Sequence, residues 1–376
     1  MATKEEKTEK KPNLKELKAL REKINQTDDQ ILALLNQRAG LAKKIVKIKK
    51  HFSEPVYFPG REEEILERLE KINPGPFPNE SIRAVFREII SACRSLERGL
   101  KVVYLGPEAT FTHIATRLQF GHKAELVPQP SIKDVFEEVE KGEADFGVVP
   151  VENSTEGIVS HTLDMFLTSN LKISAEIILE VHHCLLSKAD SLEKLNRIYA
   201  HSQALAQCRA WVRKNLPNLP IVESASTSES ARLASQDESA GAIASAYAGE
   251  YYGLKLLAER IEDVHNNFTR FLVIGNQMGE KTGKDLTMIM FSLKDRPGVL
   301  YQALGNFAKK KINLTKIESR PLKSKAWEYV FFVELEGHIQ DQKVKNALNE
   351  LEKKCIFLRV LGSFPRTRKI AQEVMA

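Results

Sequence analysis

Apolar side chains recur every three, four or seven residues through residues 14–50, which is the spacing of one face of an α-helix. This stretch contains no proline, and its only glycine is Gly40. The pattern predicts a helix of about 37 residues and about 55 Å, too long for a compact monomer, and so indicates packing along a partner. The apolar positions are Leu17, Leu20, Ile24, Ile31, Leu34, Leu41, Ile45 and Ile48.

Two further helices are predicted before residue 100, because helical patterns resume after two proline-containing breaks. "SEPVYFPG" ends the long helix, residues 61–72 are helical, and "NPGPFPN" precedes a third helix over 80–98. Residues 13–99 are therefore predicted to form an all-helical domain. The charged start "MATKEEKTEKKPN" lacks the apolar segment of a signal peptide, so residues 1–12 are expected to be a disordered tail.

From residue 101 onward, short β-rich runs alternate with helical stretches. "KVVYLG", "DFGVVPV", "RIYAHS", "IVESAS" and "AGAIAS" are each followed by a helical pattern. This alternation predicts a two-lobed, doubly wound α/β domain with a parallel sheet over residues 100–278. The long strand-like segment "LKISAEIILEVHHCLLS" is expected to cross between the two lobes.

The end of the chain has a third pattern. Residues 279–285, within "NQMGEKTGKD", are predicted to be a polar linker. Residues 286–376 then follow the order strand, helix, strand, strand, helix, strand, which is that of a ferredoxin-like α+β domain. The predicted fold class is thus multidomain: all-α, then two-lobed α/β, then α+β.

Composition excludes several classes of function. The chain has 376 residues, 42% hydrophobic and 28% charged, with a net charge of +6. It has no aromatic-basic ladder for nucleic acid and no apolar run of about 20 residues for a membrane helix. Its four cysteines form no CxxC pair, which favours a cytoplasmic protein. Without GxGxxG after a strand, a P-loop or HExxH, no cofactor or metal is expected.

Cations interrupt the apolar stripe of the long helix. Arg38 lies seven residues from both Ile31 and Ile45, and Lys49 returns to the same face about 16 Å farther on. Such cations are costly unless an anion meets them, so the pair can hold the two ends of a small dianion. Arg21, about 25 Å from Arg38, can reach the same ligand only from an antiparallel second chain. A solvated helix carrying outward Lys and Arg side chains is the alternative.

The stretches "LREKINQTDDQILALLNQRAGLAKKI", "EPVYFPGREEEIL" and "FREIISACRSLE" resemble the all-helical chorismate mutase family. In that family an intertwined homodimer builds two sites. The resemblance implies that Lys49 and Glu97 act on the ether oxygen of chorismate as catalytic residues. The full set of chorismate-binding residues that it implies is Arg21 from the second chain, Arg38, Lys49, Phe58, Arg61, Glu62 and Glu97.

Three positions depart from the usual pattern of that family. Phe58 stands where relatives often have Asp, although a backbone N–H can make the same contact. Cys93 stands where Ser is common, which would remove a hydrogen bond. Glu97 replaces Gln and donates to the ether oxygen only when protonated, so mutase activity is expected to decline toward alkaline pH. A Claisen rearrangement otherwise requires only positioning and stabilisation of charge on that oxygen.

In the α/β domain, several predicted strands end in small hydroxyl or amide residues just before a helix. The segments are "YLGPEATFT", "VPVENSTEG", "AHSQALAQC" and "ESASTSES". Each predicts a capped helix N-terminus with N–H groups free to bind an anion, at the edge of the sheet where ligands bind. An ordinary N-cap is the alternative for any one of them, but four together predict an anion-binding cleft between the lobes.

Thr269 and Arg270 precede the apolar strand "FLVIG", which needs neither a threonine nor an arginine at its start. With "YLGPEATFTHIA", "VPVENSTEGIV" and "SQALAQCRAWV", the segment "IEDVHNNFTRFLVIG" resembles prephenate dehydratase. The resemblance implies that Thr269 is the essential hydroxyl, that Arg270 binds a prephenate carboxylate and that Phe271 packs the cleft wall. Glu152 is either a proton source or a structural acid. Further candidates for binding prephenate are Asn153, Ser154, Ser202, Gln203, Ser226 and Thr227.

"KDRPGVLYQAL" and "NLTKIESRPLKSKAWEYVFFVELEG" resemble the ACT regulatory domain fused to prephenate dehydratases. The resemblance implies a phenylalanine site between paired domains. The residues that it implies are Gly298, Val299, Leu300, Tyr301, Glu318, Ser319, Arg320 and Pro321. A purely structural dimerisation module is the alternative.

The resemblances together imply a homo-oligomeric, bifunctional enzyme. It would convert chorismate to prephenate and prephenate to phenylpyruvate, with phenylalanine as inhibitor. Two alternatives stay open: an enzyme that retains only the dehydratase activity, and a non-catalytic sensor of aromatic amino acids.

Overall fold

The computed structural model describes residues 14–52, 59–96, 99–322 and 329–367. The chain divides into two compact units, one formed by residues 1–56 and 92–98 and the other by the remainder. Helix α1 (Leu14–Phe52) and the end of α3 (Asn79–Ser95) belong to the first unit. Helix α2 (Pro59–Ile72) and most of α3 belong to the second, so the predicted helical segment 13–99 contributes to both units. The expected tail, Phe58 and Glu97 lie outside the described residues.

The three predicted helices are present. Helix α1 has 39 residues, and its apolar stripe is exposed along its length, with Leu20 53% and Leu41 55% exposed. Exposed apolar surfaces of this extent are typical of sites that bind a protein or another ligand. In the second unit, Arg83 of α3 joins the glutamates Glu63 and Glu70 of α2 by ion pairs of 2.8 Å. None of the described helices is both long and apolar enough to cross a bilayer.

The first lobe of the α/β region is built on one mixed sheet of order β2-β1-β3-β11-β5, with β4 paired to β3. Its strands are β1 (Lys101–Leu105), β2 (Glu125–Gln129), β3 (Phe146–Asn153), β4 (Gly157–Ile158), β5 (Lys172–Glu180) and β11 (Phe268–Gly275). Its helices are α4 (Phe111–Phe120), α5 (Ile132–Glu140) and α6 (Ser160–Thr168). The sheet is not purely parallel as predicted, because β11 runs antiparallel to both of its neighbours.

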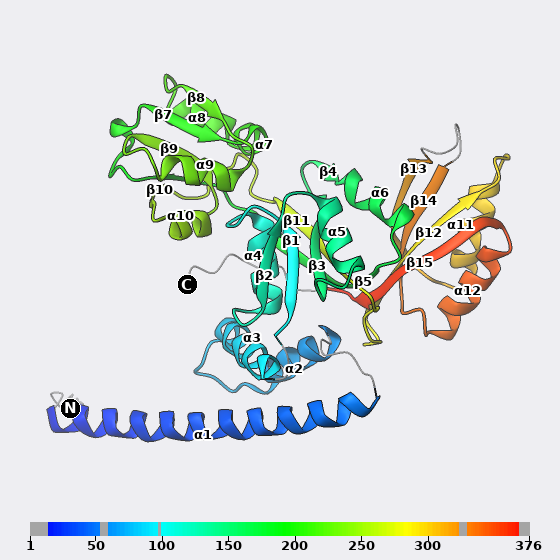
Figure 1. Cartoon of the computed structure of the whole chain (residues 1–376), viewed down its shortest axis with the longest axis horizontal. Helices are drawn as coiled ribbons and strands as arrows, with labels where there is room; N and C mark the ends of the chain where they lie inside the picture. The colour runs from blue at the N-terminus through cyan, green and yellow to red at the C-terminus, as the bar shows by residue number, and fades with distance from the viewer. Residues whose placement is uncertain (1–13, 53–58, 97–98, 323–328, 368–376) are drawn as a thin grey trace, which may run out of the picture. The chain divides into compact units, whose positions relative to one another are not determined.

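The second lobe has its own sheet of order β10-β6-β9-β7-β8, drawn in green in Figure 1. Its strands are β6 (Cys184–Ser187), β7 (Arg197–Ala200), β8 (Ile221–Glu223), β9 (Ala240–Ala244) and β10 (Lys255–Ala258). Its helices are the 3-10 turn η1 (Leu192–Lys194), α7 (Ser202–Gln207), α8 (Arg209–Asn215), α9 (Thr227–Ala234) and α10 (Ala246–Tyr252). The helical pattern predicted after "RIYAHS" is divided into two helices at Cys208.

Two crossing segments join the lobes. One leads from β5 to β6, as the strand-like segment "LKISAEIILEVHHCLLS" predicted, and the other leads from β10 back to β11. The segments are bonded to each other, since the Val181 N–H donates to the Asn267 carbonyl at 2.8 Å and the Ile261 N–H donates to the His183 carbonyl at 2.9 Å. A two-lobed arrangement with paired crossings is suited to closing on a ligand by hinge motion.

The C-terminal region has the predicted ferredoxin-like order. Its elements are β12 (Asp285–Leu293), α11 (Val299–Lys309), β13 (Leu314–Pro321), β14 (Tyr329–Glu336), α12 (Gln342–Glu352) and β15 (Cys355–Pro365). The antiparallel sheet has the order β13-β14-β12-β15. Phe291 on the sheet packs with Phe307 of α11 and Leu351 of α12 in one buried core.

The other face of this sheet shares a core with the first lobe. Met288 and Phe332 of the C-terminal sheet lie in the same buried cluster as Leu272 of β11. Strand β15 also packs directly on β5, where Gly362 leaves no room for a Cβ against the backbone of Ile173. The α/β and C-terminal regions therefore form one continuous hydrophobic structure.

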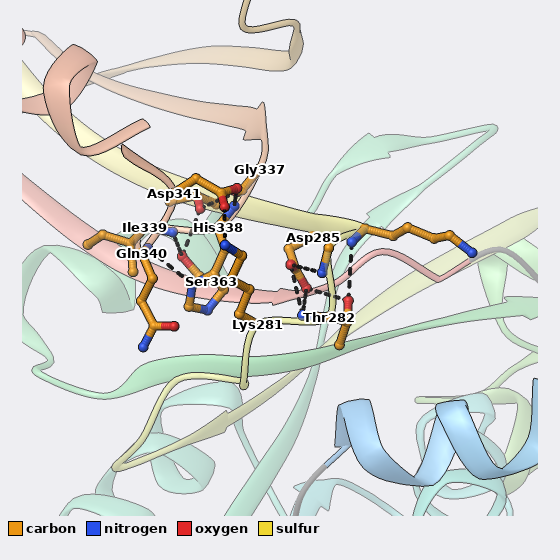
Figure 2. Close-up of polar contacts among 12 residues, drawn as sticks. Lys281, Thr282, Asp285, Gly337, His338, Ile339, Gln340, Asp341 and Ser363 are labelled. Carbon is orange, nitrogen blue, oxygen red and sulfur yellow. Dashed lines mark hydrogen bonds and ion pairs between the residues drawn. The ribbon is translucent and has the colours of Figure 1, made fainter. Parts of the chain in front are cut away.

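The predicted linker is fixed by hydrogen bonds (Figure 2). The buried carboxylate of Asp285 accepts from the Thr282 N–H, the Thr282 hydroxyl and the Gly283 N–H. Lys281 pairs with Asp341 at 2.7 Å, and the buried His338 side chain contacts the Gly279 carbonyl at 3.1 Å. The segment is thus anchored to the sheet that follows it.

Candidate active site

A cavity of about 460 Å³ lies where the two lobes meet. Its walls come from the ends of β1, β3 and β11 in the first lobe, from α7 and α9 in the second, and from both crossing segments. The ends of strands and the starts of helices meet at such an edge, which is where α/β folds bind ligands. The predicted cleft between the lobes is therefore present.

Thr269 lines this cavity and is held by Asn153 of the neighbouring strand. The Asn153 Nδ2 donates to the Thr269 Oγ1 at 2.9 Å. The opposite end of that amide is fixed, because the Asn153 Oδ1 accepts from the Thr155 N–H at 3.0 Å and the Glu156 N–H at 3.1 Å. Since the Thr269 oxygen accepts from Asn153, its own O–H is directed to another acceptor. The threonine is oriented as a donor.

A chain of amides extends this arrangement into the second lobe. The Asn153 Nδ2 also donates to the Asn267 Oδ1 at 2.8 Å, and the Asn267 Nδ2 donates to the Gln207 Oε1 at 3.0 Å. The Gln207 Nε2 then donates to the Glu156 Oε1 at 2.9 Å. A carboxylate only accepts, so Glu156 sets the direction of every bond in the chain. Amides are too weakly acidic to relay protons, so the chain orients Thr269 without protonating it.

His183 completes the second-lobe side of this network. It is 3% exposed, lines the cavity, and its Nε2 lies 2.8 Å from the Gln207 Oε1. That oxygen is an acceptor, so the Nε2 carries the proton. Burial lowers the pKa of His183, which keeps the ring neutral. The histidine thus supports Gln207 without bringing a positive charge to the cavity.

Helix N-termini face the cavity from both lobes. Thr110 caps α4 by accepting from the His113 N–H at 3.3 Å, and Ser226 caps α9 by accepting from the Glu229 N–H at 3.0 Å. The first-turn N–H groups of a helix have no acceptor within the helix and attract anions. Phe111 and Thr227, the first residues of α4 and α9, both line the cavity. Each lobe therefore places the N-terminus of one helix, which attracts anions, at the cavity.

Arg270 occupies a different place from the one expected. Side chains alternate along a strand, so Arg270 lies on the face of β11 opposite Thr269 and is absent from the cavity lining in the described chain. Its guanidinium is paired with Glu176 of β5 at 2.6 Å and with Glu334 of β14. Burial lowers the pKa of Arg270, but the two carboxylates outweigh it and raise that pKa above its usual value. The cation is thus already neutralised within the protein.

The cleft contains most, but not all, of the residues expected to bind prephenate. Ser154 bonds to the backbone of residues 266 and 268, and Ser202 lines a separate cavity of about 610 Å³ beside α8. Glu152 is paired with Lys316 at 2.7 Å, which fits a structural acid. The expected residues that line the cleft are Asn153, Gln203, Ser226, Thr227, Thr269 and Phe271.

Sequence reasoning missed Gln207, Asn267 and His183, although two of them carried a signal. Asn267 lies two residues before Thr269, and side chains two residues apart in an extended segment face the same side. Gln207 lies one helical turn after Gln203 and so lies on the same face of the helix. Nothing in the local pattern distinguishes His183 from His182, because their different surroundings arise from the crossing between the lobes.

The residues expected to bind chorismate are divided between the two compact units. Arg21 and Arg38 lie on α1, with Arg38 the less exposed of the two. Arg61 and Glu62 lie in the first turn of α2, where Arg61 pairs with Glu64 at 3.0 Å. Lys49 is part of α1, and its side chain lies outside the described set.

The expected phenylalanine-binding residues form two groups in the C-terminal region. Gly298, with φ of 76°, precedes α11, and Val299, Leu300 and Tyr301 form its first turn, where Tyr301 is 82% exposed. The second group, residues 318–321, closes β13. Its Arg320 differs from a free ligand-binding group, because it donates to Ser160 at 2.6 Å and to Asp164 at 3.0 Å on α6.

The chain combines a long helix with an exposed apolar stripe, a two-lobed cleft containing a donor threonine and a ferredoxin-like sheet. Together these features define a multidomain enzyme. Family models match all three parts: chorismate mutase type II over residues 20–98, prephenate dehydratase over 102–279 and the ACT domain over 287–353. A bifunctional chorismate mutase/prephenate dehydratase of Aquifex aeolicus is 52% identical over 357 residues, covering 94% of this chain and 99% of its own. The chain belongs to the bifunctional chorismate mutase/prephenate dehydratase family.

Solved structures agree with this assignment for the α/β and C-terminal regions. The prephenate dehydratase from Arthrobacter aurescens in complex with L-Phe is 35% identical, with a TM-score of 0.66, and covers 71% of this chain and 90% of that one. GqqA, described as a novel type of quorum quenching acylase, is 27% identical, also with a TM-score of 0.66, and covers 71% of this chain and 98% of that one. The three resemblances read from the sequence, and the enzyme class that they implied, are confirmed.

Proposed function

We propose that the chain catalyses two consecutive reactions, the rearrangement of chorismate to prephenate and the decarboxylative dehydration of prephenate to phenylpyruvate. The second reaction is supported by the position of the Thr269 hydroxyl at the wall of the cavity. The hydroxyl oxygen accepts a hydrogen bond from Asn153 at 2.9 Å, so its own proton is directed away from Asn153. Family membership over nearly the whole chain supports both reactions.

The dehydration makes few chemical demands on the protein. The bond between the ring and its carboxylate breaks, the carboxylate leaves as carbon dioxide, and the electron pair of that bond makes the ring aromatic. The ring C–O bond breaks as the departing oxygen takes a proton from Thr269 and leaves as water, and solvent then returns a proton to the threonine. Asn153 supports this step by donating to the Thr269 oxygen as negative charge develops there.

The two carboxylates of prephenate are proposed to bind at the helix N-termini rather than at Arg270. The described residues that line the cavity include no Lys or Arg. Backbone N–H groups at the starts of α4 and α9, with the hydroxyl of Thr227 and the side chain of Gln203, can supply the necessary donors. Such donors orient an anion by direction as well as charge, which suits a step that must hold two carboxylates apart.

The mutase reaction is proposed to take place in a homodimer. The exposed apolar stripe of α1 supports a second copy packed along it. Arg38, Lys49 and Arg21 of the second chain would bind the carboxylates and ether oxygen of chorismate. Glu62 would bind the ring hydroxyl with support from Arg61. Glu97 would face the ether oxygen opposite Lys49, and the backbone N–H of Phe58 would make a further contact.

Phenylalanine is proposed to inhibit the dehydratase by binding to the ACT domain. The similarity to a dehydratase structure described as a complex with L-Phe supports this effector. Its site would be formed by residues 298–301 and 318–321 of paired domains. Inhibition requires that phenylalanine bind one conformation of the enzyme better than another. We also place the protein in the cytoplasm, since Cys93, Cys184, Cys208 and Cys355 are free thiols.

One experiment separates these proposals from the alternatives. Purified protein is given chorismate, and separately prephenate, and phenylpyruvate is followed by its absorbance in alkali. Formation from both substrates is expected. Formation from prephenate alone would indicate an impaired mutase, and formation from neither would indicate a sensor or the acylase chemistry described for GqqA. Titration with phenylalanine should lower the rate, and no binding or inhibition at saturation would overturn the regulatory proposal.

A further inference from the structure

The strands that carry Thr269 and Asn153 have a second pair of functional side chains on their opposite face. In the β3–β11 ladder, Thr269 is opposite Asn153 and Arg270 is opposite Glu152. Because side chains alternate, the first pair faces the cavity and the second faces away from it. A shift of the Arg270 or Glu152 side chain would therefore displace the backbone that positions the catalytic threonine.

Both of these rear-facing residues are held by the ACT domain. The Lys316 Nζ of β13 lies 2.7 Å from the Glu152 Oε2, and the Lys316 side chain is only 14% exposed. Arg270 is paired with Glu334 of β14, whose side chain is 5% exposed. Thr315, next to Lys316, donates to the Glu334 Oε1 at 2.6 Å, so one segment of β13 touches both ion pairs.

We propose that Lys316 and Glu334 are positioning residues for the dehydratase reaction. They fix Glu152 and Arg270, and through the ladder they set the distance and direction between Asn153 and Thr269 on the other face. The buried Arg270–Glu334 pair suits this purpose because its geometry is narrowly defined and losing one partner leaves an uncompensated charge. The Lys316–Glu152 pair is half-buried, since the Glu152 side chain is 37% exposed, and it fixes Glu152 from the side of Lys316. This role rests on the proposed function of Thr269, and it assigns part of the dehydratase site to the regulatory domain.

The same strand provides a physical route for an effector. Lys316 lies two residues before Glu318, where the proposed phenylalanine-binding stretch 318–321 begins. A ligand that shifts the end of β13 would also shift Lys316 and Thr315, and with them the ladder behind Thr269. Inhibition would then act on the orientation of the threonine and so on kcat, with little change in KM.

The test compares Lys316→Met with Lys345→Met, the same change at an exposed lysine of α12 in the same domain. Lys316→Met should lower kcat for prephenate by about tenfold to a hundredfold while KM stays within about twofold, because a small misplacement of catalytic groups has effects of this size. Lys316→Arg should restore most of kcat, and the control should behave as wild type. Circular dichroism at the assay temperature checks that each variant is folded.

A double-variant cycle distinguishes positioning from general loss of structure. Glu152→Gln combined with Lys316→Met removes both charges of one pair, so the double variant should have a kcat no lower than the worse single variant. Wild-type kcat in Lys316→Met, or losses that multiply in the double variant, would overturn the inference. Turnover of prephenate by the wild-type protein tests the proposed function separately. If the wild-type protein does not convert prephenate, the proposed function itself is rejected, whatever the effect of Lys316.

Discussion

The orientation of Thr269 as a donor depends on one amide, and Asn153→Asp tests it with almost no change in size. The Asn153 Nδ2 donates at 2.9 Å to the Thr269 Oγ1 and at 2.8 Å to the Asn267 Oδ1. A carboxylate in its place offers only acceptors, so the Thr269 proton would turn toward Asp and away from the substrate. The variant would also place a negative charge beside a dianionic substrate.

Asn153→Asp is expected to lower kcat strongly and the free energy of unfolding moderately. Withdrawing one preorganised donor costs about 10²–10³ in kcat, or about 3–4 kcal/mol. Losing two hydrogen bonds costs about 1–3 kcal/mol of stability. Initial rates of phenylpyruvate formation at saturating prephenate, corrected for the rate without enzyme, measure the first effect, and urea unfolding measures the second. Asn218→Asp adds the same charge at an exposed loop position and should leave both unchanged.

The pH dependence of this variant gives a second, independent check. A protonated Asp can donate again, so kcat of Asn153→Asp should rise as the pH falls toward the pKa of that carboxyl group, about 4 or higher beside other anions. The wild type has no such group and should not show this rise. A variant that keeps wild-type kcat at neutral pH would refute the assignment of Thr269 as an oriented donor.

Three other changes test separate parts of the account. Arg270→Met leaves Glu176 and Glu334 without their counter-charge and should lower the unfolding free energy by about 3–5 kcal/mol. Burial already raises the pKa of Glu176, so its protonation favours the folded state as the pH falls. Urea unfolding of Arg270→Met should therefore show a smaller loss of stability in acid than in alkali. Glu97→Gln should keep mutase activity and remove its decline toward alkaline pH, as followed by chorismate consumption, and a wild-type enzyme with a flat profile would contradict the role of Glu97. Gly298→Ala, at φ of 76°, should cost about 1 kcal/mol and weaken phenylalanine inhibition while uninhibited kcat stays within about twofold; unchanged dose–response curves would exclude that loop from the effector site.

The elements that the sequence predicted well are those whose identity depends on local spacing. The long helix was predicted to within a few residues, and the βαββαβ order and the helix after "AGAIAS" were also predicted. Strand β2 and helix α5 were not predicted, since β2 contains Pro128 and α5 is mostly charged. The direction of β11 was also missed, because antiparallel pairing follows from the return crossing between lobes and leaves no mark in the strand itself.

The candidate site shows the same division. Hydroxyl and amide residues at the ends of strands predicted a cleft, and Asn153, Ser226 and Thr269 do line one. Arg270 could not be placed from its position beside Thr269, because the carboxylates that hold it belong to β5 and to the ACT domain. Adjacent residues on a strand share a motif but face opposite ways, so the motif alone does not assign both to the substrate.

The role of the Thr269 hydroxyl is tested most directly by the dehydration of prephenate by Thr269→Val, a variant of nearly equal volume that lacks only the hydroxyl. If the threonine protonates the departing oxygen, the folded variant should lose about 10²–10³ in kcat, and Thr269→Ser should retain most of the activity. A folded Thr269→Val protein that forms phenylpyruvate from prephenate at the wild-type rate would show that Thr269 is not the proton donor.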